Sequence, residues 1–113
     1  MNTSAIDRVS LLDRVGGDEE LLREITSIFL AEYPELLRSI ENGMAAGDPQ
    51  RVERAAHSLK GSVANFGADS ATQAAYRMET IGRKGSLTEA PAAYEELISQ
   101  FQRLQPVLEQ LSE

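Results

Sequence analysis

The residues best suited to chemistry lie around the chain's single histidine, in the stretch ERAAHSLKGSVANFGAD at residues 53–69. A surface imidazole is largely neutral and nucleophilic near pH 7, because the ordinary pKa of histidine is about 6.5. Lys60 follows His57 by three residues, so on a helix its ammonium lies beside any group that the imidazole receives. An anion is the group that such a pair would favour. Without these neighbours, His57 would be interpreted as an ordinary solvated side chain.

Gly61 is unusual because it stands inside a predicted helix, where glycine costs about 1 kcal/mol relative to alanine. It shares the outward face of this helix with His57, and together with Ala64 it leaves a bare strip along which a partner's backbone could approach the imidazole. The alternative is that Gly61 lets two helices pack closely, which its place on the outward face disfavours. Arg54 is on the same face and would steer an acidic partner, or is simply solvated.

Five helices are predicted to position this face, at approximately residues 5–15, 18–45, 49–66, 70–84 and 88–112, with a last loop near 82–87. Apolar residues recur every three or four positions in each of them, and capping residues and glycines separate them. Pro34 predicts a kink rather than a break in the second helix, because the apolar stripe continues through it. The expected core positions of that helix are Leu22, Ile25, Phe29, Tyr33, Leu36, Ile40 and Met44.

This pattern predicts an all-α fold, an antiparallel up-and-down four-helix bundle with a short extra N-terminal helix. A chain of 113 residues fits one domain, spanning residues 1–113. On the third helix we expect an inward stripe of Val52, Ala55 or Ala56, Leu59, Val63 and Phe66.

Composition excludes several classes of function. Eleven Lys and Arg against 18 Asp and Glu give a net charge of −7, which argues against nucleic acid as a partner. The chain has no cysteine, so disulfides and thiolate metal sites are excluded. It also has no apolar run near the ~18 residues of a transmembrane helix and no form of a signal peptide. We therefore expect a soluble, cytoplasmic protein without a membrane partner, and no residues have the spacing of a metal site.

The segment AAHSLKGSVANFGA resembles the signature of histidine-containing phosphotransfer (HPt) domains, in which a surface histidine on a four-helix bundle is followed by Lys-Gly at the third and fourth positions. FLAEYPELLRSIENGMAAGD resembles the family's proline-bearing helix and acidic turn, so the resemblance covers nearly the whole chain. It implies that His57 is the phosphoacceptor, that Lys60 lies near the phosphoryl group and that Gly61 admits the partner. Glu79 falls where the family often has a polar residue that orients the imidazole. That Glu79 is instead a solvated carboxylate stays open.

The resemblance implies a carrier in a multistep two-component phosphorelay, a stoichiometric phosphoryl carrier rather than an enzyme. A response-regulator receiver domain would dock, Nε2 of His57 would take the phosphoryl group from its phosphoaspartate, and another receiver aspartate would remove it. A hybrid sensor histidine kinase is the other expected partner. Any Mg²⁺ would belong to the receiver, and the carrier would have no cofactor of its own. We expect a monomer, because no second exposed apolar seam is obvious in the sequence. The partner surface would contain Arg54, His57, Lys60, Gly61 and Ala64, with contributions from the first and second helices.

Two alternatives are a non-catalytic helical bundle that binds receivers or a kinase without accepting phosphate, and an enzyme that uses His57 as a general base. A general base normally lies in a cleft among other polar groups. His57 is predicted on a convex helix face, which disfavours the enzyme.

Overall fold

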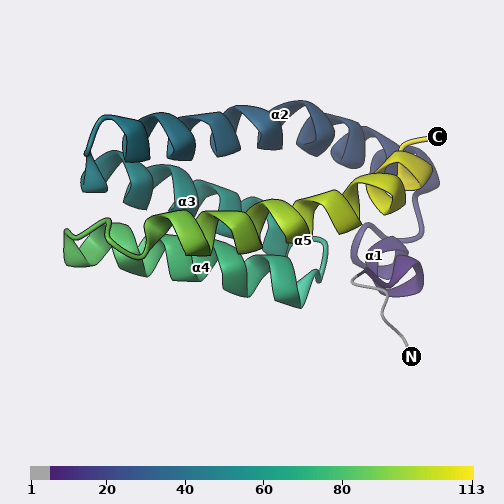
Figure 1. Cartoon of the computed structure of the whole chain (residues 1–113). Coiled ribbons are helices and arrows are strands. Elements are labelled where there is room, and N and C mark those ends of the chain that lie inside the picture. The colour runs from purple at the N-terminus through teal and green to yellow at the C-terminus, as the bar shows by residue number, and fades with distance from the viewer. Residues whose placement is uncertain (1–5) are drawn as a thin grey trace.

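The computed structural model describes residues 6–113, and this part of the chain contains helices and no strand (Figure 1). Its elements are α1 (Arg8–Arg14), α2 (Glu19–Ala45), α3 (Pro49–Ala64), α4 (Asp69–Lys84) and α5 (Ala90–Leu111). Helices α2 to α5 run up and down beside one another, and α1 covers the end of the bundle where α2 begins and α5 ends (Figure 1). The predicted all-α bundle with a short extra helix is confirmed.

Aspartates begin the first three helices, and glycine helps to end them. Asp7, Asp18 and Asp48 are N-caps, and each side chain accepts a hydrogen bond from a backbone amide in the first turn of its helix. Gly67, between α3 and α4, has a φ of 69°, a left-handed conformation that favours glycine. The first helix begins at residue 8 rather than 5 and the last covers 90–111 rather than 88–112. Residue 5 lies outside the described residues.

The buried face of α2 differs from the predicted stripe. Thr26 is fully buried, whereas Ile25 is 37% exposed, so the expectation that Ile25 belongs to the core is wrong. Thr26 tolerates burial because its hydroxyl donates a hydrogen bond of 2.7 Å to the carbonyl of Leu22. Helix α2 continues through Pro34 as one helix, so the proline does not divide it.

Helices α3 and α4 approach closely at Gly82, which lies inside α4 rather than in the predicted last loop. A Cβ atom added to Gly82 would lie 2.6 Å from the backbone nitrogen of Glu53 and 2.7 Å from the carbonyl oxygen of Pro49. Only glycine fits such a backbone contact. The contact brings Glu79, one turn earlier on α4, against the middle of α3.

Candidate functional site

His57 lies on the exposed face of α3, and 66% of its side chain is accessible to solvent. Arg54, Gly61 and Ala64 are exposed on the same face. The opposite face of the helix is buried in the bundle through Val52, Ala55, Ala56, Leu59 and Val63. The helical period of α3 alone therefore separates the imidazole from the core.

Glu79 is the principal partner of the imidazole. Its side chain is only 3% exposed, and its Oε2 lies 2.9 Å from Nδ1 of His57. Its Oε1 lies 2.8 Å from Nζ of Lys60. Glu79 is therefore not a solvated carboxylate, the alternative that the sequence left open. It reaches His57 because α3 and α4 pack tightly at Gly82.

The pKa of Glu79 determines the role of each ring nitrogen. Burial acts to raise the pKa of this carboxyl, but hydrogen bonds from Lys60 and His57 outweigh burial and lower the pKa below its ordinary value. Glu79 is thus ionised at neutral pH and can only accept hydrogen bonds, so Nδ1 of His57 must donate. In a neutral imidazole, Nε2 then keeps its lone pair, which makes it the nucleophilic atom.

Lys60 is held between two groups of α4. Its Nζ pairs with Glu79 and lies 5.0 Å from the centre of the Tyr76 ring, within cation–π range. The side chain is 27% exposed, so the ammonium remains at the surface on the α4 side of the imidazole. The structure thus brings His57, Lys60 and Glu79 together.

Arg83 and Glu53 complete the charge cluster, and sequence reasoning missed Arg83 and gave no role to Glu53. Nη2 of Arg83 lies 2.6 Å from Oε2 of Glu79, the same oxygen that accepts from His57. Nε of Arg83 lies 3.3 Å from Oε2 of Glu53. The signal was present, because Arg83 follows Glu79 by four residues and His57 follows Glu53 by four, which places each pair on one helix face.

Gly61 leaves open space beside the imidazole. A Cβ atom added there would have no atom within 4 Å, apart from neighbours along the helix itself, in contrast to one added at Gly82. Gly61 therefore does not serve helix packing, the alternative considered from the sequence. Gly61 leaves the outer surface of α3 free between His57 and Ala64.

Comparison with known proteins places this geometry in a family. A family model described as the Hpt domain matches residues 24–111. The chain belongs to the Hpt domain family. This Hpt domain is similar to histidine-containing phosphotransfer protein B (HptB) from Pseudomonas aeruginosa PAO1, whose crystal structure superposes with a TM-score of 0.87 at 28% identity. That match covers 96% of this chain and 95% of the other. A search of curated proteins found no match.

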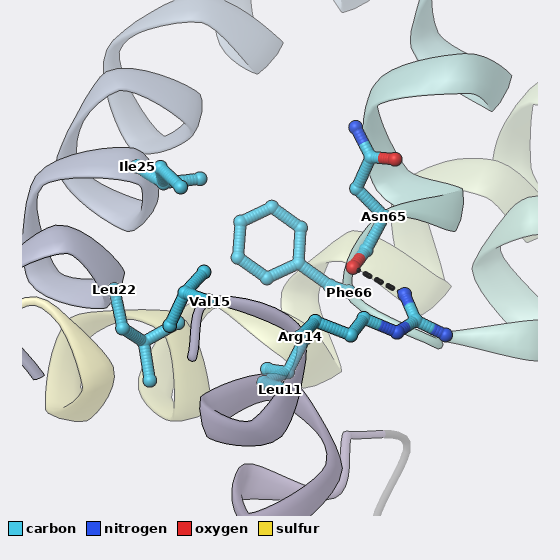
Figure 2. A pocket seen from close by; sticks show the side chains of 7 residues that line it. All are labelled: Leu11, Arg14, Val15, Leu22, Ile25, Asn65 and Phe66. Carbon is cyan, nitrogen blue, oxygen red and sulfur yellow. Dashed lines mark hydrogen bonds between the residues drawn. The ribbon is translucent and has the colours of Figure 1, made fainter. Parts of the chain in front are cut away.

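The Hpt domain has an apolar hollow of about 220 Å³ at the end of α3, beside α1 and the first turns of α2 (Figure 2). The ring of Phe66 lies between the side chains of α1 and α2 there, and Arg14 of α1 donates a hydrogen bond of 2.7 Å to the carbonyl of Asn65. The hollow is lined by Leu11, Arg14, Val15, Leu22, Ile25, Asn65 and Phe66. Ile25 is thus at the rim of this hollow rather than in the core.

Exposed apolar side chains extend this hollow along α2 of the Hpt domain. Leu21, Ile25 and Ile28 are 38%, 37% and 61% exposed, and their spacing of four and three residues places them on one face of α2. Further along α2, Glu32 accepts a hydrogen bond from Ser62 of α3. This places the apolar stripe of α2 on the side of α3 opposite to Glu79.

The described residues of the Hpt domain offer neither a metal-binding cluster nor a membrane-spanning helix. Within residues 6–113, no three His, Asp or Glu side chains are grouped so that they could hold a metal ion. None of the helices in that range is both long and apolar enough to cross a membrane.

Proposed function

We propose that this Hpt domain accepts a phosphoryl group on Nε2 of His57 from the phosphoaspartate of one receiver domain and passes it to the aspartate of another. The observation that carries the proposal is the hydrogen bond between Nδ1 and the buried Glu79 carboxylate, which leaves Nε2 of an exposed imidazole free to attack. Membership of the Hpt family supports phosphotransfer in a multistep two-component phosphorelay.

The transfer step needs little from the carrier beyond position and charge. The lone pair of Nε2 forms the N–P bond while the O–P bond of the acyl phosphate breaks and the aspartate leaves as a carboxylate. The ring becomes cationic and keeps its Nδ1 proton against Glu79. Lys60 lies beside the ring and offsets the charge of the phosphoryl oxygens. Transfer to the second aspartate is the same step in reverse.

The partner surface combines the exposed face of α3 with the apolar side chains of α2. From His57 to Ala64 the strip on α3 extends about 10 Å, at 1.5 Å per residue. Arg54 and Lys60 supply positive charge at its margins, and Gly61 allows close approach. Leu21, Ile25 and Ile28 supply apolar contact area. A carrier must release each partner, so we expect a total buried area below about 1,200 Å².

The carrier has no turnover of its own and works as a cytoplasmic monomer. Receiver domains and a hybrid sensor histidine kinase are its partners, and the receiver holds the Mg²⁺ that the reaction uses. Support for these partners comes from the family.

The test is incubation with a receiver that carries a radiolabelled phosphoryl group. Wild-type protein should acquire a label that is acid-labile and base-stable, as phosphohistidine is. His57→Gln should acquire none, and this variant contains no other histidine. Ser58→Ala, a change at the next exposed position, is the control. Persistent acid-labile label in His57→Gln would sink the assignment, and docking without label would favour the non-catalytic binding module.

A further inference from the structure

The Glu79 carboxylate pairs with more groups than are needed to orient the imidazole of His57. One oxygen accepts from both His57 and Arg83, at 2.9 and 2.6 Å, and the other pairs with Lys60 at 2.8 Å. A neutral amide could orient the ring equally well, because its carbonyl oxygen also accepts a hydrogen bond from Nδ1. Orienting the ring therefore does not explain why this buried side chain is a charged carboxylate.

The charge matters once Nε2 carries a phosphoryl group. If Nδ1 is protonated, the ring is cationic, and the N–P electron pair returns to Nε2 to give a neutral imidazole as leaving group. If Nδ1 is deprotonated, the same step would expel an imidazolate anion, a far poorer leaving group. The protonation state of Nδ1 thus decides whether the phosphoryl group can move on.

We infer that the negative charge of Glu79 keeps Nδ1 of phosphorylated His57 protonated and so holds the phosphoryl group in its transferable form through neutral and mildly alkaline pH. This inference rests on the proposed function of His57. Glu79 acts through the imidazole and does not touch the phosphoryl group, so it is a positioning residue whose charge, rather than its hydrogen bond alone, is required.

Other charged groups around the ring limit how strongly Glu79 favours the protonated form of Nδ1. Glu53 and Arg54 lie beside the ring on α3, Lys60 pairs with Glu79, and Arg83 shares an oxygen of Glu79 with the ring. An opposite charge in direct contact shifts a pKa by about 1 to 3 units. Because two cations share this carboxylate and the imidazole is mostly exposed, we expect the smallest effect that such a contact gives, about a tenfold change in transfer at alkaline pH.

The experiment loads His57 with phosphoramidate, a small phosphoryl donor, so that loading does not depend on a receiver. Transfer from the loaded protein to a receiver is then measured between about pH 6 and about pH 9, and the Nδ1 titration of the phosphorylated ring is followed by NMR. In Glu79→Gln we expect both profiles to move to lower pH by about one unit, so that transfer is about tenfold slower at the alkaline end. The amide keeps the shape and the acceptor but removes the charge.

Glu95→Gln is the matched control. It removes the same unit of charge, but from an exposed position on α5, a helix that carries none of the residues of this charge cluster. We expect its alkaline transfer rate to stay within about threefold of the wild type. Glu79→Asp provides a second variant, which keeps the charge but withdraws it by one methylene, and it should give an intermediate shift.

The possible results separate the two proposals. Unchanged pH profiles in Glu79→Gln, or a slowing that is uniform at every pH, would overturn the inference while the phosphotransfer function stands. Failure of wild-type protein to form phosphohistidine with either donor would instead overturn the function of His57, and the inference with it.

Discussion

Two glycines inside helices of this Hpt domain should respond in opposite directions to the same substitution. At Gly61 an added Cβ would meet nothing within 4 Å beyond its own helix, so Gly61→Ala should gain the full helix propensity difference, about 1 kcal/mol. For a domain of this size that corresponds to a rise in Tm of about 4 °C.

Gly82→Ala carries the same gain in propensity, but here the added Cβ would lie 2.6 to 2.9 Å from backbone atoms of α3. Backbone atoms cannot rotate away as a side chain would, so α3 and α4 must move apart. Overpacking of this kind typically costs about 1 to 3 kcal/mol. We therefore expect a net loss of stability of up to about 2 kcal/mol, together with a weaker contact between His57 and Glu79.

The assay is urea unfolding followed by far-UV circular dichroism, combined with phosphoryl transfer from a labelled receiver. Gly61→Leu should fold with nearly wild-type stability but lose transfer by about 100-fold, because its side chain fills the approach to the imidazole. If Gly61→Ala and Gly82→Ala changed stability in the same direction, the distinction between an access glycine and a packing glycine would be refuted. Wild-type transfer by Gly61→Leu would refute the steric argument.

Four further predictions concern side chains of the site, the α2 surface and a helix cap. Lys60→Ala should slow phosphoryl transfer about tenfold with little loss of helicity, measured by label transfer and circular dichroism. Ile28→Asp should weaken receiver binding in titration calorimetry while phosphoramidate still loads His57, since Ile28 is exposed on α2. Asp48→Ala should cost about 1 kcal/mol in urea unfolding, because the backbone amide of Arg51 loses its cap. The folded-state pKa of Glu79 is lowered, so its contribution to the free energy of unfolding is present at neutral pH and is lost as pH falls through that pKa. A flatter acid limb in Glu79→Gln, seen by unfolding at several pH values, would check this, and an unchanged limb would contradict it.

The sequence predicted the fold well where local rules govern it. Aspartate caps and left-handed glycines lie at the ends of helices, and the period of α3 placed His57 outward, because these features depend on residues within one or two turns. The prediction was wrong on α2, where apolar character suggested Ile25 for the core and the structure buries Thr26 instead. Thr26 is acceptable there only because its hydroxyl bonds the carbonyl of Leu22, which composition does not reveal.

The site shows the same division between local and tertiary information. By itself, the sequence determined that an exposed histidine, a neighbouring lysine and the bare strip at Gly61 lie together, since all three are within two turns of one helix. Only the tertiary structure decided that Glu79, 22 residues away, is buried and shared by His57, Lys60 and Arg83. The physical reason is that the offset between α3 and α4 depends on how the whole core packs, including the backbone contact at Gly82.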